Sequence, residues 1–439
     1  MAGDRSTIGA LLDETGGSIK TGPFGTKLKA SEYTATGVPV ISVGEVGFGR
    51  LRIHHDTPRV DETVSSRMPE FLLKAGDIVF GRKGAVERSA QLQPDEDGYF
   101  LGSDGIRIRL NIESCDPKFI AYQLQTTAHR SWMIQHAAGT TMPSLNEGII
   151  RRIPIVLKPL PEQKAIASIL GTLDDKIELN RRMNATLEAM ARALFQSWFV
   201  DFDPVRAKLD GRPPTGLDPE TAALFPATFQ DSPLGHIPQG WRVGSIYEIA
   251  NVIYGAPFAS SLFNSEKLGK PLIRIRDLPN ESPAVFTTEV HPKGYLLQPG
   301  DIAVGMDGEF RAYLWAGVES WLNQRVCVFA PKLGYSAAFV RNSIFAPLAQ
   351  VEATETATTV IHIGKNDIDR FTVIIPDARV AEAFKRQCQP WYDQIVANKQ
   401  QSRTLATLRD TLLPKLLSGE LTVPRSCQDN KIAAPLLTK

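Results

Sequence analysis

An internal repeat constrains the fold of this 439-residue chain more than any other feature. The segment LLKAGDIVFGRKGAVERSA at 72–90 matches LLQPGDIAVGMDGEFRAYL at 296–314, and both keep the frame GDIxxGxxG. Further upstream, GVPVISVGEV at 37–46 matches GKPLIRIRDL at 269–278. From Thr140 onward the two copies align without a gap. Because such self-similarity means one structural unit built twice, we predict two similar units related by a pseudo-two-fold.

Each copy ends in a long segment with the spacing of a coiled-coil helix. In PLPEQKAIASILGTLDDKIELNRRMN (159–184), apolar residues recur at alternating steps of four and three, and the stripe then meets Asn180. An Asn in such a seam lowers stability but fixes register and partner. The second copy places Asn398 at the level of Asn180. We therefore predict that helices within 159–200 and 377–421 pair as an antiparallel coiled coil, and a helix of roughly 35 residues in each would be about 50 Å long.

The seam positions of the two helices correspond one for one in the repeat alignment. In the first helix these positions are Ile166, Leu170, Leu173, Ile177, Asn180, Asn184, Leu187, Ala191, Leu194 and Trp198. In the second helix they are Phe384, Cys388, Trp391, Ile395, Asn398, Ser402, Leu405, Arg409, Leu412 and Leu416. A slipped register would change the separation of whatever the helices carry. We therefore expect the pair to act as a spacer between the two units.

The units themselves have the pattern of an α+β fold. Short apolar or alternating runs such as PVISV, DIVFG and IRIRL, separated by Gly-rich turns, are typical of strands. The stretch 119–135 and its counterpart AAFVRNSIFAPLAQVEA have helical spacing. We therefore predict two similar α+β units, at 1–158 and 241–376, separated by the two long helices.

Two further segments lack sustained periodicity. Residues 201–240 are rich in Pro, Gly and Asp, which favours an irregular crossover with a short helix near 219–224. Antiparallel helices need such a return path. The tail at 422–439 is predicted to have no fixed structure.

No motif of catalysis, nucleotide binding or metal binding is present in the sequence. GxxxxGK[ST], HExxH, GxSxG and a Gly-rich dinucleotide fingerprint are all missing. The four cysteines, at 115, 327, 388 and 427, have neither zinc-site nor disulfide spacing. We therefore expect no catalytic residue, no metal ligand and no cofactor in this chain. Since there is no signal peptide and no apolar run of membrane-spanning length, we expect a cytoplasmic protein without membrane contact.

The repeat keeps its frame but changes its polar residues, as Lys83 in the first copy and Asp307 in the second illustrate. Two copies of one scaffold with different donors and acceptors suit two ligands of one kind. Base edges in the DNA major groove are such ligands, because Arg and Lys suit guanine, Asn and Gln suit adenine, and acidic groups accept from cytosine. A net charge of +1, from 49 basic and 48 acidic residues, means that only local basic patches can serve phosphate contacts.

The candidate DNA contacts combine these polar residues with nearby basic ones. In the first copy they are Lys20, Lys27, Arg50, Arg52, Arg82, Lys83, Arg88, Ser103, Asp104 and Arg107, with Arg109 beside them. In the second copy they are Arg274, Arg276, Asp307, Arg311, Asn323, Gln324 and Arg325.

The chain resembles a known family, the specificity (S) subunits of type I restriction-modification systems. The resemblance extends from about residue 8 to 421. Its most specific parts, in order, are PLPEQKAIASILGTLDDKIELNRRMN, ALFQSWFVDFDPV, LGHIPQGW and TLLPKLLSGEL. One departure is that the second helix entry, IIPDARVAEAFKRQ, lacks PLPEQ. Another is that Arg409 stands where the first seam has Ala191. These departures leave the equivalence of two partner-docking sites open.

The resemblance implies a non-catalytic subunit with two target recognition domains. Each domain would read one half of a bipartite, asymmetric target in double-stranded DNA, and the paired helices would set the gap. Such subunits recruit two modification subunits, which methylate adenine with S-adenosylmethionine. They also recruit two restriction subunits, which translocate and cut DNA with ATP and Mg. The alternatives from the residues alone are a two-lobed nuclease and a structural scaffold that does not bind DNA.

Overall fold

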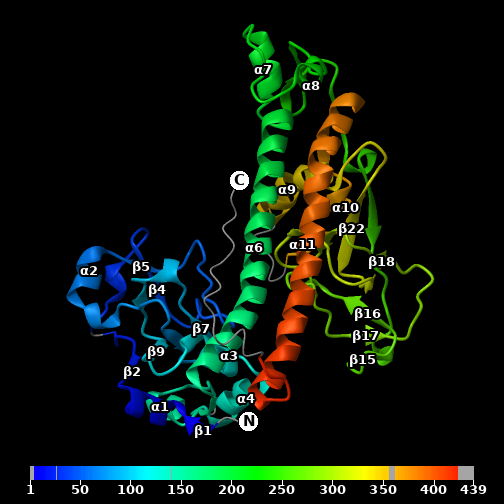
Figure 1. Ribbon diagram of the computed structural model, residues 1–439. Coiled ribbons are helices and arrows are strands. Elements are labelled where there is room, and N and C mark those ends of the chain that lie inside the picture. Colours follow the sequence, from blue (N-terminus) through cyan, green and yellow to red (C-terminus); the bar gives the residue numbers. More distant parts are fainter. Residues whose placement is uncertain (1–3, 26, 140, 355–360, 424–439) are drawn as a thin grey trace. The chain divides into compact units, whose positions relative to one another are not determined.

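The computed structural model describes residues 4–25, 27–139, 141–354 and 361–423. These residues form two compact units (Figure 1). Unit 1 comprises the chain up to Asp175 together with the chain from Leu405, and unit 2 comprises Lys176–Thr404. The two long helices, α6 (Leu160–Phe199) and α11 (Ala378–Ser418), each contribute residues to both units. Each unit therefore contains one globular region and one stretch of both long helices.

Within the part of unit 1 that the structure describes, there are ten strands. They are β1 (Asp4–Thr7), β2 (Ser18–Thr21), β3 (Tyr33–Thr34), β4 (Val38–Ile41), β5 (Arg59–Val60), β6 (Ile78–Gly81), β7 (Ser89–Gln91), β8 (Phe100–Leu101), β9 (Gly105–Arg109) and β10 (Pro154–Leu157). One sheet has the order β2-β9-β6-β7 and is antiparallel throughout. A second has the order β3-β5-β4-β8, in which β4 and β8 are parallel, and β1 pairs antiparallel with β10.

Short helices complete the globular part of unit 1. They are α1 (Ile8–Thr15), α2 (Glu62–Arg67), α3 (Pro117–Leu124), α4 (Thr127–His136) and α5 (Glu147–Arg151), with 3₁₀ turns at Ala30–Glu32, Pro69–Phe71 and Pro94–Glu96. The stretch 119–135, predicted as one helix, is interrupted because Thr126 adopts an extended conformation and caps α4, accepting a hydrogen bond from the His129 N–H. Its hydroxyl satisfies a free N–H at the new helix start, which favours the break.

Unit 2 repeats this plan. Its strands are β11 (Phe229–Ser232), β12 (Gly235–Pro238), β13 (Arg242–Ser245), β14 (Ala250–Tyr254), β15 (Phe263–Asn264), β16 (Lys270–Ile273), β17 (Phe286–Thr287), β18 (Leu296–Leu297), β19 (Ile302–Gly305), β20 (Ala312–Leu314), β21 (Ser320–Leu322), β22 (Val326–Pro331) and β23 (Thr372–Ile375). Its short helices are α7 (Asp203–Leu209), α8 (Pro219–Ala223), α9 (Ala337–Thr354) and α10 (Lys365–Ile368), with 3₁₀ turns at Ile246–Glu248, Ser260–Leu262 and Ile275–Asp277.

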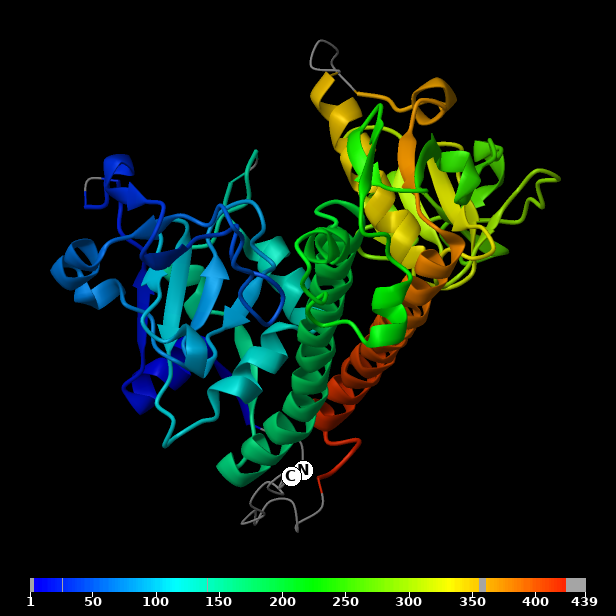
Figure 2. The same cartoon turned by 90° about the horizontal axis from the view of Figure 1, so that it is seen from above.

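The sheet topology confirms the internal repeat. The order β14-β22-β19-β20 in unit 2 reproduces β2-β9-β6-β7 in unit 1. The order β15-β17-β16-β21-β18 reproduces β3-β5-β4-β8 with one added strand, and β16 and β21 are parallel like β4 and β8. The pair β13-β23 reproduces β1-β10. Figure 2 shows the yellow α9 against the sheet of unit 2, where it packs on β22, β20 and β23.

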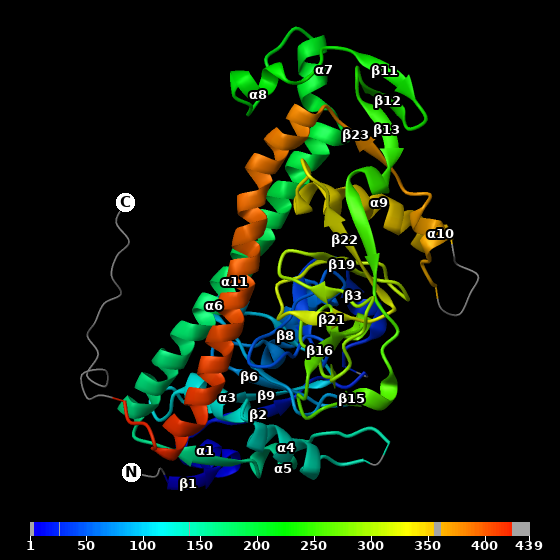
Figure 3. The same cartoon turned by 90° about the vertical axis from the view of Figure 1, so that its right-hand side faces the viewer.

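The long helices run antiparallel within each unit (Figure 3). In unit 1, Ile166 and Leu170 of α6 share a core with Leu413 and Leu416 of α11. In unit 2, the rings of Trp198 in α6 and Phe384 in α11 lie 5.8 Å apart between centroids. Position numbers rise along one helix as they fall along the other, which is the predicted antiparallel arrangement.

Each globular region places its apolar sheet face against helices. In unit 1, Ile78 and Phe80 of β6 and Ile106 of β9 are buried in one cluster with Phe119 of α3. In unit 2, the corresponding strand β19 buries Ile302 and Val304 with α9. Because the long helices join these clusters, the sheet β2-β9-β6-β7 in unit 1 and the sheet β14-β22-β19-β20 in unit 2 each share a core with short helices and the helix pair. The second sheet of each unit buries residues such as Val40 and Leu272 in separate clusters.

The segment 201–240 is more regular than its Pro and Gly content indicated. It contains α7, α8 and the hairpin β11-β12. Phe202, Val205, Phe225 and Ile237 are all buried in the core of unit 2. Tertiary burial of these irregularly spaced apolar residues orders the segment, and a periodicity search does not detect such burial.

Of the tail at 422–439, residues 424–439 lie outside the described residues. Val423 is buried in the core of unit 1. Among the residues that the structure describes, no helix has both the length and the apolarity needed to cross a membrane.

Candidate nucleic-acid interface

Two turns occupy equivalent places in the two units. Turn 1 (82–84) follows β6, and turn 2 (306–308) follows β19. Each ends on a glycine with a left-handed backbone, with φ of 74° at Gly84 and 79° at Gly308. Side chains other than hydrogen are strained in that region. This explains why both copies of the GDIxxGxxG frame keep the last glycine.

The same backbone hydrogen bonds hold both turns. In unit 1 the Gly84 N–H donates to the Pro143 carbonyl at 2.9 Å. In unit 2 the Gly308 N–H donates to the Ile361 carbonyl at 3.0 Å. The frames are therefore equivalent in their contacts as well as in their sequence.

Each turn also forms an antiparallel bridge to the segment that holds it. Lys83 is bridged to Ser144, and Asp307 is bridged to His362. Sequence reasoning did not select Ser144 or His362. The available signal was the gapless part of the repeat alignment, which places Ser144 opposite His362.

Turn 1 presents basic side chains. An Arg82 guanidinium N–H donates to the Ser103 carbonyl at 3.2 Å, and the guanidinium lies 5.2 Å from the ring centroid of Phe24, which is 58% exposed. The Lys83 ammonium lies 3.6 Å from the Asp104 carboxylate. Four predicted contacts, Arg82, Lys83, Ser103 and Asp104, are thus brought together at this turn.

Turn 2 presents an acidic side chain in the same place. Asp307 Oδ1 lies 2.6 Å from His362 Nδ1 and 3.6 Å from Arg325 Nη1. Asn323 and Gln324 precede Arg325 directly in the loop before β22. The structure therefore brings two predicted contacts of the second copy, Asp307 and Arg325, together at the equivalent site, and Asn323 and Gln324 are the next residues along the loop.

Arg107 does not fit its predicted role as a phosphate contact. It is 6% exposed, and its guanidinium donates to the Ser18 hydroxyl at 3.1 Å across the β2-β9 pair. Burial lowers its pKa from the ordinary arginine value. Its neighbour Arg109 forms two hydrogen bonds to the Asp77 carboxylate, at 2.7 and 2.6 Å. The side chains of both arginines are therefore held by hydrogen bonds inside unit 1.

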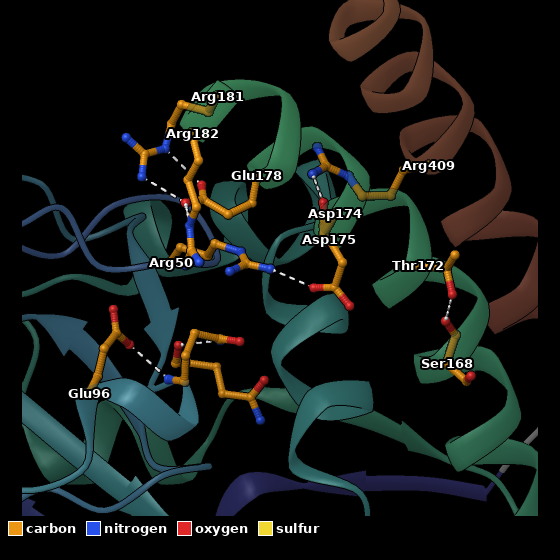
Figure 4. Close-up of polar contacts among 12 residues, drawn as sticks. Arg50, Glu96, Ser168, Thr172, Asp174, Asp175, Glu178, Arg181, Arg182 and Arg409 are labelled. Carbon is orange, nitrogen blue, oxygen red and sulfur yellow. Dashed lines mark hydrogen bonds and ion pairs between the residues drawn. The ribbon is translucent and has the colours of Figure 1, made fainter. Parts of the chain in front are cut away.

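The other basic candidates of unit 1 form contacts with other residues or are exposed. Lys20 and Lys27 place their ammonium groups 5.1 and 5.9 Å from the ring centroid of Phe71. Arg52 is exposed. Arg50 donates to the Asp175 carboxylate at 2.9 Å, so it links the loop after β4 to α6 (Figure 4).

Arg88, at the end of the β6-β7 connection, belongs to a cluster that sequence reasoning missed. Its guanidinium lies 5.7 Å from the centroid of Phe48, and that of Arg130 lies 4.2 Å from the same ring. Phe48 is 41% exposed. Two cations on one exposed ring suit a phosphate contact, but no pattern in the sequence links Arg130 to Arg88.

In unit 2 the remaining arginines differ in how they are held. Arg274 lies 3.1 Å from the Asp277 carboxylate within one 3₁₀ turn. Arg276 is exposed. Arg311 is shared between Glu309 and Glu352, at 3.2 Å from each.

The helix seam contains a layer of polar side chains inside unit 2. The Asn180 amide donates to the Ser402 hydroxyl at 3.2 Å and to Gln401 Oε1 at 2.8 Å. The Asn398 amide donates to Asn184 Oδ1 at 2.8 Å. The Asn180–Ser402 and Asn398–Asn184 contacts are equivalent under the repeat. Asn180 of α6 therefore donates to α11, and Asn398 of α11 donates to α6, in a pseudo-two-fold arrangement.

The other predicted seam positions are buried or half-buried in both helices. Arg409, the departure from the repeat, donates to the Asp174 carboxylate at 2.5 Å within unit 1 (Figure 4). The Tyr122 hydroxyl donates to the same carboxylate at 2.5 Å. Burial and the Asp174 charge raise the pKa of Tyr122, which keeps the phenol a donor.

Unit 2 also holds a cavity of about 1060 Å³ between α6, α9 and β23. Phe195, Phe339 and Phe345 give it apolar walls, and Arg192 and Arg370 add charge at its lining. In unit 1, His129 Nε2 lies 2.8 Å from the Pro154 carbonyl oxygen, so α4 contacts the edge strand β10.

Within the described ranges, no group of three or more His, Cys, Asp or Glu side chains is placed to hold a metal ion. Cys115, Cys327 and Cys388 are buried free thiols, and burial raises the pKa of Cys115 to about 11 and that of the other two to about 12. Cys427 lies outside the described residues.

Comparison with known proteins decides the family. A model of the type I restriction modification DNA specificity domain matches residues 23–189 and 238–386, which together are more than half of the chain. The chain belongs to this family. It is a DNA specificity subunit of a type I restriction-modification system, with DNA and the other subunits of such a system as partners.

Individual relatives agree with this placement. The specificity subunit of type I restriction enzyme HindI from Haemophilus influenzae is 25% identical over 404 residues, covering 80% of this chain and 87% of the relative. The EcoBI specificity subunit of Escherichia coli is 29% identical over 191 residues, 42% of this chain and 40% of the relative. In fold, the chain is similar to a solved S subunit from M. genitalium, with a TM-score of 0.54, 16% identity and coverage of 94% and 95%.

Proposed function

We propose that each unit of this specificity subunit reads one half of a bipartite, asymmetric DNA sequence. The observation that carries this proposal is the pair of equivalent turns. One backbone frame holds Lys83 in unit 1 and Asp307 in unit 2, so the same scaffold offers different hydrogen-bonding groups. Different groups on one frame suit two different short base sequences.

The paired helices would set the number of unread base pairs between the halves. The polar layer around Asn180 and Asn398 supports this role, because a slip by one heptad would separate its hydrogen-bonding partners. A fixed register gives a fixed span for the readers. The span then selects one gap length in the target.

The chain would act without catalysis of its own. It would recruit two modification subunits, which supply methyl transfer to adenine with S-adenosylmethionine, and two restriction subunits, which use ATP and Mg. The assembled complex would act on DNA in the cytoplasm. Incubation of the purified chain alone with DNA and Mg should yield no cleavage, and reproducible cleavage would favour a nuclease instead.

The decisive experiment exchanges residues 8–150 for the same region of another specificity subunit. The complex with its modification subunits would then methylate a randomised duplex library. We expect one half of the methylated motif to change and the other half to stay. A matched exchange of 241–376 should change the opposite half. An unaltered motif in both exchanges would refute the proposal.

The spacer role has its own test. One heptad added to each helix, after Asn184 in α6 and before Asn398 in α11, keeps the seam in phase and lengthens the pair by about 10 Å. Since duplex DNA advances about 3.4 Å per base pair, the unread gap should grow by about three base pairs. A heptad added to α6 alone is the control. It should disturb pairing rather than shift the gap.

A further inference from the structure

Turns 1 and 2 carry opposite charges at equivalent positions of the repeat. This difference affects which bases each turn can bind. The inference rests on the proposed function. Lys83 and Asp307 hold the same position in the repeat and form equivalent backbone bridges. The Lys83 side chain is 49% exposed and that of Asp307 is 29% exposed. Each is open enough to meet a ligand while its backbone is fixed.

At position 83, turn 1 offers a side chain with donors only, and the Asp104 carboxylate lies 3.6 Å from its ammonium group. The lysine ammonium has three N–H groups and no acceptor, so it can pair only with acceptors. Arg82 beside it is oriented by the Ser103 carbonyl and the Phe24 ring. Guanine presents two adjacent acceptors, O6 and N7, in the major groove. Guanine is therefore the base edge that suits turn 1.

Turn 2 offers the Asp307 carboxylate as an acceptor, although a carboxylate is usually unfavourable close to DNA. Phosphates repel a carboxylate, so an acidic residue at a DNA surface lowers affinity unless a donor meets it. The positive side chain of Arg325, 3.6 Å from Asp307, offsets part of this repulsion. Both the His362 and the Arg325 contacts go to Oδ1. Within the part of the chain that the structure describes, Oδ2 is thus left to accept from a ligand.

The chemistry of the groove separates cytosine from adenine. Cytosine presents the N4 amino donor without an adjacent acceptor, whereas adenine presents its N6 donor next to the N7 acceptor. A carboxylate would face N7 unfavourably, and adenine is better matched by the paired donor and acceptor of Asn or Gln. We propose that Asp307 of turn 2 accepts the N4 amino group of a cytosine, whereas Lys83 of turn 1 donates to a guanine.

The test uses the complete chain assembled with its modification subunits, methylating a randomised duplex library. Asp307→Asn adds a donor to the acceptor, so the half-site read by unit 2 should lose about tenfold of its preference for cytosine at one position and accept adenine there. Lys83→Met should relax one guanine in the other half by a similar factor. Glu309→Gln is the matched control, because Glu309 lies beside turn 2, is 76% exposed and already pairs with Arg311. It should leave the motif unchanged.

A second measurement leaves the protein unaltered. Replacing each cytosine of the selected half-site in turn by 2-pyrimidinone removes the N4 amino group alone, and one replacement should weaken methylation by the unaltered complex about tenfold. A motif that stays the same with Asp307→Asn, together with tolerance of every 2-pyrimidinone, would overturn the inference. If the unaltered complex selected no motif at all, the proposed function itself would fail.

Discussion

The two ends of the helix pair are packed with different chemistry. In unit 2 the ring of Phe199 lies 4.9 Å from that of Phe339 and 5.1 Å from that of Phe384, between centroids. In unit 1 the corresponding stretch is aliphatic, and a carboxylate, Asp174, receives hydrogen bonds from Tyr122 and Arg409. The repeat therefore conserves helix geometry and sheet order while the aromatic residues at one end of the helix pair correspond to aliphatic residues at the other. The two copies therefore share a backbone arrangement, whereas the side-chain contacts that fill it differ.

The largest effect should come from the aromatic end. Phe199→Ala removes a buried ring, 2% exposed, and should lower the free energy of unfolding by about 3–5 kcal/mol. Hydrogen exchange of the intact chain would locate the loss of amide protection in unit 2. The matched variant is Leu417→Ala, at the equivalent position of α11 and only partly buried, which should cost less and act in unit 1. Equal losses in both units would contradict the contrast between the ends.

The polar end should respond less. Arg409→Ala leaves Asp174, whose side chain is 17% exposed, without its cation and should cost about 1–3 kcal/mol. Adding Asp174→Asn should recover part of that loss, because the unpaired charge is gone. Urea denaturation of the two variants and the parent gives both values. The idea is wrong if the double variant is less stable than Arg409→Ala.

The polar layer of the seam should matter for register more than for stability. Asn180→Leu with Asn398→Leu extends the apolar seam, so the unfolding free energy should stay within about 1 kcal/mol of the parent or rise. The methylated motif should then include more than one gap length. Retention of a single gap length in library sequencing would show that register is set elsewhere in the helices.

The smallest effect concerns a charge difference between the two helices. Glu178 of α6 stands at the repeat position of Val396 in α11, and hydrogen bonds from Arg181 and then Arg182 lower its pKa from 4.5 to about 2. A depressed carboxyl pKa adds stability above the unfolded value, and that stability is lost as pH falls from about 4.5 toward 2. Glu178→Gln should cost about 0.5 kcal/mol at pH 7. The difference from the parent should shrink at pH 3, and a constant difference would contradict the assignment.

Much of the architecture could be predicted because the repeat and the seam are local patterns. A shared GDIxxGxxG frame and an apolar stripe interrupted by Asn180 and Asn398 were enough to predict two α+β units and antiparallel helices. The interruption between α3 and α4 could not be predicted from spacing, because it rests on a Thr126 cap. The order within 201–240 likewise depends on burial of scattered residues such as Phe202.

The candidate site was only partly predictable, and for a physical reason. Sequence alternation shows which residues neighbour a turn, but it does not show which arginines are used inside the fold, as Arg107 and Arg109 are. His362 enters the site through a bridge to Asp307 that spans a long stretch of chain. Such long-range contacts are set by the tertiary fold and leave no local signal.

The division of the long helices between the units has a consequence for biosynthesis. Unit 2 is one continuous stretch, Lys176–Thr404, whereas unit 1 draws its core from segments on both sides of that stretch, including Leu413, Leu416 and Val423. On the ribosome, unit 2 can therefore complete its core first, while the residues before Lys176 must wait for those after Thr404. A nonsense codon just after Thr404 would leave unit 2 whole and deprive unit 1 of the helix that closes it.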